Sequence, residues 1–294
     1  MTRTNRYEHM SVTTRLHRVN LDRILAAALV LACLTSLRSA YADNDFSVYS
    51  PNLVEGQSEI ELRSFDYQDA RSELNTANGV SLSLAHTFTN WWKSELYVAE
   101  YNRAPGYSSQ PTGYEFENTF QLTDPGEYWA DVGLLVSYAY AKVPGVANNA
   151  ELALLLEKRV GHFNQKFNLI REKYMGNGAP ELISTTNLTS TGTGKGKGKG
   201  TTVTTITTVA VGAPGGYPSR FAYSASYKFS DDFMPGVEAY YHAGDNGFQM
   251  GPVVYGELKS FSGSELEYSI GVLYANNSQS PSRTYVARLE YDFF

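Results

Sequence analysis

The sequence contains a single cysteine, Cys33, and few basic residues. A disulfide scaffold needs paired cysteines and a cysteine-ligated metal centre needs several, so both are excluded for the rest of the chain. Lys and Arg number 24 against 30 Asp and Glu, which gives a formal net charge of −6. This balance argues against a nucleic-acid partner, because phosphate binding needs clustered basic side chains. Hydrophobic residues still make up 42% of the 294 residues, and this excludes wholesale disorder.

Long apolar runs are also missing, because no window after residue 42 approaches 18 apolar residues. We expect residues 1–42 to be a secretory signal peptide, since arginines precede a short apolar run and Ala40 and Ala42 form a small-x-small cleavage site. A rival interpretation makes Cys33 the lipidated residue of a lipoprotein. Residues 43–294 then form the exported domain, which has no candidate transmembrane helix.

Alternation of apolar and polar residues with period two fills this domain and predicts β-strands with one apolar face. Seven segments alternate clearly and five weaker ones fill the gaps between them, which gives about 12 strands. The clear segments are 80–88, 114–122, 128–140, 150–156, 221–229, 266–274 and 285–293, and the weaker ones are 59–67, 92–101, 166–174, 235–243 and 250–258.

The predicted connections alternate between short and long. The short ones are 89–91, 123–127, 161–165, 230–233 and 259–264, and the mostly longer ones are 68–78, 102–113, 143–149, 175–218, 244–249 and 275–283. This asymmetry is typical of outer-membrane barrels, which have short periplasmic turns and longer extracellular loops. The sequence therefore predicts an all-β fold, a transmembrane up-and-down antiparallel β-barrel of about 12 strands with both termini on the short-turn side.

Alternation alone does not say which face meets lipid, since a soluble lipocalin-like barrel alternates with its apolar face inward. Aromatic residues gather near both ends of the predicted strands, for example Trp91 and Trp129 beside short turns and Tyr140 and Tyr274 toward long loops. Two such belts match the aromatic girdles of a membrane barrel. An inward apolar face would also have to fill a 12-stranded cylinder, which is hard to pack because about eight strands already suffice for a filled interior.

The chain ends in an aromatic strand, residues 285–293, followed by Phe294. In this the sequence resembles Gram-negative outer-membrane β-barrel proteins, a broad class whose last strand ends in an aromatic residue. The resemblance implies that Tyr291, Phe293 and Phe294 form a signal read by the outer-membrane assembly machinery, by strand addition. The alternation ends on Phe293 and leaves Phe294 one residue over. Residues 116–140 are also similar to uncharacterised proteobacterial barrel proteins, and neither resemblance implies an activity.

The polar face of the predicted strands supplies the candidate functional residues. If the apolar face meets lipid, the lumen is lined by Glu115, Glu117, Asp131, Glu151, Glu157, Arg159, Lys228, Glu238, His242, Glu265, Glu267, Arg288 and Glu290. Unpaired charges in a narrow lumen are costly, so we expect pairs such as Glu157 with Arg159 and Arg288 with Glu290. The excess of carboxylates favours cations in a continuous water path.

These observations leave two classes of function. One is a passive, porin-like channel for small solutes, and the other is a non-conducting surface barrel that binds or adheres through its external loops. In the second class the luminal charges form a closed salt-bridge network. An open lumen favours transport, whereas a plugged lumen favours the surface role. The sequence names no substrate and predicts no oligomeric state.

An enzyme is the weakest alternative. After residue 42 the chain has three histidines, of which His86 falls on an apolar strand face and His162 in a short turn. His242 shares a strand face with Glu238, the arrangement of a base held by a carboxylate, but no Ser within two residues completes a triad for a lipid hydrolase. Residues four apart on a strand lie roughly 13 Å apart, so these two cannot share a metal ion. We expect no catalytic residue, no metal and no cofactor.

The long connection 175–218 contains alternating lysines and glycines, Lys195, Lys197 and Lys199, followed by the Thr/Val tract 201–211. Glycine at every second position prevents packing, so we expect a flexible external loop. Its lysines could attract lipopolysaccharide phosphates, although a solvated insertion without a ligand is the simpler interpretation. The Thr/Val tract extends a hairpin above the membrane or stays disordered. Lipid and lipopolysaccharide of the outer membrane are thus the expected partners.

Overall fold

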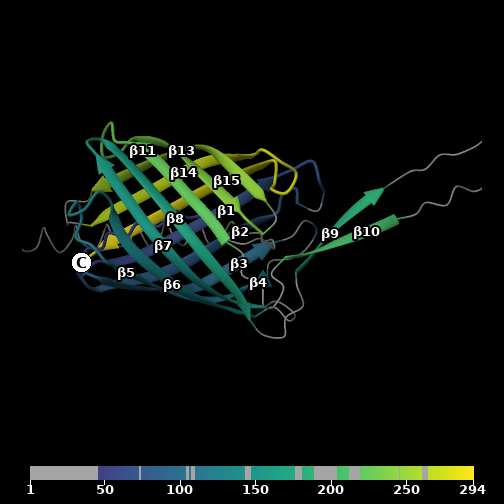
Figure 1. Ribbon diagram of the computed structural model, residues 1–294, viewed down its shortest axis with the longest axis horizontal. Helices are drawn as coiled ribbons and strands as arrows, with labels where there is room; N and C mark the ends of the chain where they lie inside the picture. The colour runs from purple at the N-terminus through teal and green to yellow at the C-terminus, as the bar shows by residue number, and fades with distance from the viewer. Residues whose placement is uncertain are drawn as a thin grey trace, which may run out of the picture.

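A computed structural model describes residues 46–72, 74–103, 106, 110–142, 147–175, 181–188, 204–211, 219–244, 246–259 and 264–294. Twelve antiparallel strands close into a barrel, and a two-stranded hairpin extends from one end of it (Figure 1). Within these residues no helix is long and apolar enough to cross a membrane. The expected signal peptide with Ala40 and Ala42, and also Cys33, lies outside the described residues and stays a prediction.

The barrel strands follow one another around the wall in chain order. They are β1 (Ser58–Gln68), β2 (Asn78–Thr89), β3 (Trp92–Arg103), β5 (Gly113–Gln121), β6 (Asp131–Ala141), β7 (Asn148–Val160), β8 (Phe163–Met175), β11 (Ser219–Tyr227), β12 (Met234–His242), β13 (Gly247–Lys259), β14 (Glu265–Ala275) and β15 (Arg283–Phe293). The two-residue strand β4 (Gln110–Pro111) adds to the end of β3. The first and last strands, β1 and β15, pair along their whole length and close the cylinder. The predicted fold class and the number of strands are confirmed.

The two faces of the wall differ as the alternation predicts. Along β15, Thr284, Val286 and Asp292 are buried, whereas Tyr285 between them is exposed. The same parity on β14 leaves Ile270 61% exposed on the outer surface. Such exposure of large apolar side chains is costly in water, so hydrocarbon is the solvent that this surface fits.

Aromatic side chains are exposed at both ends of the wall. Trp91 and Trp129 lie beside short turns, and Tyr140 and Tyr274 lie toward the long loops. These rings have a polar edge or hydroxyl that stays wet while the ring contacts lipid, so the two belts mark the two membrane interfaces. The long-loop end is accordingly the extracellular end, and the short-turn end is the periplasmic one.

The predicted start of the strand at residue 128 is wrong, because β6 begins at Asp131. The carboxylate of Asp131 accepts a hydrogen bond from the Gly126 amide at 2.6 Å, and the Thr123 hydroxyl accepts one from the Val132 amide at 2.8 Å. These bonds stabilise a longer turn in which Gly126 has a φ of +77°. The turn leaves Trp129 76% exposed at the periplasmic interface.

The long connection after β8 contains two strands, β9 (Glu181–Leu188) and β10 (Thr204–Val211), which pair antiparallel. Figure 1 shows this hairpin projecting beyond the end of the barrel. Of the two alternatives for the Thr/Val tract, the structure therefore has the hairpin. Lys195, Lys197 and Lys199 lie outside the described residues.

Candidate functional site: the barrel lumen

A segment of the chain that precedes β1 runs inside the barrel. At one end of it, the ring of Phe46 packs against Phe65, Tyr67 and Tyr240, with ring centroids 5.4–6.1 Å apart. Phe65 and Tyr67 belong to the extracellular half of β1. At the other end, the side-chain amide of Asn52 donates to the Asp131 carboxylate at 3.1 Å, at the periplasmic start of β6. Residues 46–53, the luminal segment, therefore extend along the barrel axis.

Side chains of the wall satisfy the backbone of the luminal segment. The Tyr49 amide donates to Asn168 Oδ1 at 2.7 Å, and Asn168 Nδ2 donates to the Tyr49 carbonyl at 3.0 Å. The Leu53 amide donates to Gln121 Oε1 at 2.8 Å. Backbone groups buried without partners are costly, so these wall residues decide where the segment lies.

A first charged cluster holds the hydroxyl of Tyr49. This hydroxyl donates to Glu117 Oε1 at 3.0 Å and accepts from Arg63 at 3.3 Å. The Arg63 guanidinium also lies over the rings of Tyr49 and Tyr97, at 5.4 and 5.2 Å from their centroids. It pairs with Glu61 at 2.6 Å, so the cluster combines ion pairing with cation–π contact.

A second cluster crosses the lumen between β15 and β12. Arg288 makes a bidentate pair with Glu238, at 2.8 and 2.6 Å. The hydroxyls of Tyr240 and Tyr255 donate to the same carboxylate at 2.7 and 2.8 Å. Arg288 Nε donates to the Phe46 carbonyl at 2.9 Å, which ties the luminal segment to this cluster. A buried ion pair is tolerated when its geometry is bidentate and its remaining donors and acceptors are also hydrogen-bonded.

Further cation–carboxylate groups line the rest of the wall. Arg220 on β11 contacts both Glu151 and Glu172, and Arg220 is 4% exposed. Glu157 accepts from Ser50 of the luminal segment and from Arg159. Charged groups thus occur near both ends of the lumen, and between them Leu135, Leu155 and Ile170 form a buried apolar cluster against which Tyr49 packs.

The two halves of the lumen differ in character. The extracellular half contains a cluster of buried apolar side chains against which Phe46 and Val48 pack. Near the periplasmic end, the carboxylates of Glu59, Glu290 and Asp292 offer oxygens within 4.8 Å of one another. Among the described residues this is a group of carboxylates that could hold a cation. Lys93, whose ammonium lies 2.7 Å from Glu59, already supplies one positive charge there.

The structure places most of the candidate lumen residues on the inward face. Glu115, Glu117, Asp131, Glu151, Glu157, Glu238, His242, Glu267, Arg288 and Glu290 occupy inward positions of their strands. Arg159 and Glu265 share that parity near the periplasmic mouth, where their side chains are 66% and 37% exposed. Lys228 follows β11 in a short turn and pairs with Asp231 at 2.8 Å, so it lies at the mouth and not along the wall.

Of the two ion pairs predicted from the sequence, one is present, and the prediction of the other is wrong. Arg159 pairs with Glu157 at 2.8 Å. Arg288 pairs with Glu238 and not with Glu290, because its side chain spans the lumen to β12 instead of contacting its own strand. Sequence reasoning also missed Arg63, Lys93 and Arg220, which strand parity combined with register assigns to the lumen.

The terminal aromatic residues end the seam between β1 and β15. The rings of Tyr291 and Phe293 stack at 5.8 Å on the outer face, and Phe294 follows the strand with 73% of its surface exposed. An exposed aromatic terminus is accessible to another protein, and its recognition by the assembly machinery stays a prediction.

The chain is similar to known proteins in its structure and not in its sequence. No family model and no curated protein matches the sequence. Among solved structures, an outer membrane channel from Pseudomonas putida F1 is similar with a TM-score of 0.52 and 10% identity, over 86% of this chain and 99% of that chain. The NanC porin gives a TM-score of 0.46 and 10% identity, over 80% of this chain and 99% of that chain. At such identity the likeness shows the fold alone.

The closed antiparallel barrel, with charged side chains inside and an apolar exterior, has the fold of a Gram-negative outer-membrane β-barrel protein, and the Pseudomonas putida F1 channel shares this fold. The resemblance carried by the last strand is thus confirmed at the level of the fold. In this chain the lumen contains the luminal segment, held by side chains from several different strands.

Proposed function

We propose that this protein is a passive outer-membrane channel for small solutes, with the conducting path lying between the wall and the luminal segment. The observation that carries the proposal is the set of charged side chains facing the lumen at both of its ends, from Arg220 with Glu151 and Glu172 near the extracellular end to Asp292 at the periplasmic end. The structural neighbour in Pseudomonas putida F1 is itself named a channel, which agrees with this assignment.

Carboxylates at the periplasmic mouth give the proposed channel its selectivity. Glu59, Glu290 and Asp292 lie together and share one lysine, so acidic side chains outnumber basic ones in this group. Negative charge lining a narrow, low-dielectric path raises the local concentration of cations. We therefore assign a preference for cations over anions.

The second candidate is a non-conducting barrel, and the luminal segment is the observation that favours it. Clusters such as Arg288 with Glu238 cross the lumen and, together with residues 46–53, narrow any path. In that case the extracellular loops and the β9–β10 hairpin carry the function, by binding or adhesion at the cell surface.

Catalysis has no support in the lumen. Both oxygens of Glu238 are occupied, by Arg288, Tyr240 and Tyr255, so this carboxylate is not free to orient His242 as a base. We assign no enzymatic activity.

The protein reaches the outer membrane through the periplasm, where Tyr291, Phe293 and Phe294 bind the assembly machinery.

Planar-bilayer recording tests the proposal. Wild-type protein inserted from detergent is expected to conduct, with a reversal potential in a KCl gradient that shows cation preference. The variant Glu290→Gln/Asp292→Asn is expected to shift the reversal potential toward zero, whereas Glu127→Gln, on an exposed turn at the same end, is the matched control. Absence of conductance from correctly folded wild-type protein would leave the surface-barrel function in its place.

A further inference from the structure

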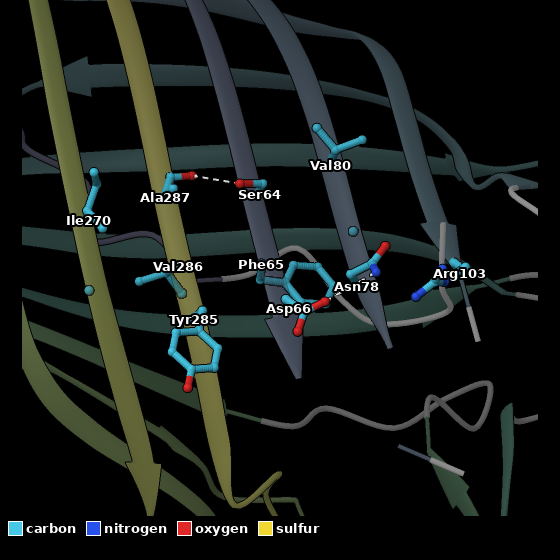
Figure 2. A pocket seen from close by; sticks show the side chains of 12 residues that line it. Ser64, Phe65, Asp66, Asn78, Val80, Arg103, Ile270, Tyr285, Val286 and Ala287 are labelled. Atoms are coloured by element: carbon cyan, nitrogen blue, oxygen red, sulfur yellow. Dashed lines mark hydrogen bonds between the residues drawn. The ribbon is translucent and has the colours of Figure 1, made fainter. Parts of the chain in front are cut away.

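The outer surface of the barrel has a depression beside the seam between its first and last strands. It has a volume of about 460 Å³ and spans β14, β15, β1, β2 and the end of β3. Figure 2 shows side chains of these neighbouring strands around it, including Ile270, Tyr285, Ala287, Ser64 and Arg103. The depression lies toward the extracellular ends of these strands.

Strand parity puts this depression on the lipid-facing side. Phe65 and Val286 are buried in the lumen, so their neighbours Ser64 and Ala287 point outward. Ser64 and Ala287 lie opposite each other in the register and both are small, and the Ser64 hydroxyl contacts the Ala287 carbonyl at 3.4 Å. Larger outward side chains, such as the exposed Ile270, stand on the flanks. The small pair therefore forms the floor of a hollow within an otherwise bulky apolar wall.

A cationic side chain lies at the extracellular end of the hollow. Arg103 donates to the Thr76 carbonyl at 2.6 Å, and its Nε is buried without a hydrogen-bond partner. Because Nε is buried, an anionic ligand contacts the guanidinium through its Nη atoms, on the same side of the barrel as the carboxylate of Asp66, which also lines the depression. A phosphate is the group that its planar set of donors binds best.

Charged side chains on the outer surface, at the extracellular end of the barrel wall, also favour an anionic ligand. Among the described residues that face outward at the extracellular end of the barrel wall, the charged ones are Asp66, Arg103, Lys142, Arg171, Lys173 and Arg283. Five of these are basic and one is acidic, on a chain whose formal net charge is −6. Arg103, Arg283 and Asp66 belong to the strands of the depression, whereas Lys142, Arg171 and Lys173 lie at the ends of β6 and β8, farther around the wall. Basic residues concentrated at the level of lipid headgroups attract anionic lipid.

We propose that the depression is a binding site for lipid A, the membrane anchor of lipopolysaccharide. One acyl chain lies over Ser64 and Ala287, and a phosphate of the same molecule binds Arg103. The assignment to lipid A rests on position, since the basic rim is at the long-loop end and thus in the outer leaflet, where lipopolysaccharide is the anionic lipid. The site is on the outer surface and does not depend on whether the lumen conducts.

Native mass spectrometry of the detergent-solubilised protein with purified lipid A tests the proposal. Wild-type protein is expected to retain one lipid A molecule. Arg103→Ala removes the phosphate contact and Ala287→Leu fills the floor, so each is expected to lower the affinity at least fivefold. Ala239→Leu is the matched control, because Ala239 also faces outward, on β12 at a similar depth. Both leucine variants add apolar surface to the lipid face, so folding is not at risk.

Two outcomes would overturn the proposal. One is equal lipid A binding by wild type, Arg103→Ala and Ala287→Leu, since the depression would then have no part in it. The other is a wild-type affinity for phosphatidylglycerol equal to that for lipid A, since any anionic phospholipid would then suffice. Loss in the two site variants, with full retention in Ala239→Leu and weak binding of phosphatidylglycerol, supports it.

Discussion

The side chain of Asn168, on β8, forms two hydrogen bonds with the backbone of Tyr49, at 2.7 and 3.0 Å. The Tyr49 N–H donates to Asn168 Oδ1 and the Tyr49 carbonyl accepts from Asn168 Nδ2, as they would with a neighbouring β-strand, but a single amide side chain supplies both partners. Asn168 is completely buried, so neither of these backbone groups can turn to bulk water for a substitute. The luminal segment is thus positioned by the wall and not by strand pairing.

Replacing Asn168 is expected to loosen the segment without opening the barrel. Asn168→Ala leaves the amide and the carbonyl of Tyr49 without their partner, at a cost of about 1–3 kcal/mol. The control is Asn164→Ala, on the same strand and the same face but near the periplasmic mouth. Urea unfolding of the refolded proteins measures the difference. Equal midpoints for the two variants would show that Asn168 does not anchor the segment.

Replacing Arg288 is expected to destabilise the barrel more strongly. Arg288→Met leaves the carboxylate of Glu238 buried and without its cation, which costs about 3–5 kcal/mol. Adding Glu238→Gln removes the uncompensated charge, so the double variant is expected to regain much of that loss. Arg159→Met is the comparison, because an ion pair whose arginine is mostly exposed contributes at most about 1 kcal/mol. A double variant no more stable than Arg288→Met would contradict this explanation.

Low pH is expected to release the extracellular loop 275–283 from the loop that follows β1. Hydrogen bonds from Arg71 hold the pKa of Asp69 below its usual range, and Asp69 also accepts from the Ser282 amide at 2.7 Å. Because the pKa is lowered in the folded state, the stabilisation is present above the unfolded pKa of about 3.9 and is lost as the pH falls through the folded value.

Hydrogen exchange of the Ser282 amide measures this contact. After correction for intrinsic rates, protection is expected to be constant from pH 7 down to about pH 4 and to fall below that pH, and Asp69→Asn is expected to lower it already at pH 7. A variant with unchanged protection would show that Asp69 does not hold the loop.

Strand positions followed from the sequence because alternation repeats wherever one face meets lipid. Residues 285–293 illustrate this, since every second residue from Tyr285 is apolar and faces outward. The partner of Arg288 did not follow. Glu238 lies three strands away around the wall, and the distance across the lumen depends on barrel closure, which local patterns do not encode.

The luminal segment escaped prediction for a different reason. The apolar residues of 46–53 do not recur with the period of a strand or of a helix. The segment is held by side chains of several strands, and a local pattern does not show such contacts. Asn168 likewise reads as an ordinary polar residue on the inner face of a strand. Its role appears only when Tyr49 is placed opposite to it.

Single-channel conductance of wild-type protein beside a variant lacking residues 46–53 tests the central claim most directly. The claim is that a polar lumen crosses the membrane and that this segment narrows it. We predict a small conductance for wild type and a severalfold larger one for the deletion variant, with the β-sheet circular dichroism spectrum unchanged. Equal conductance in the two proteins, or none in either of them, would contradict the account.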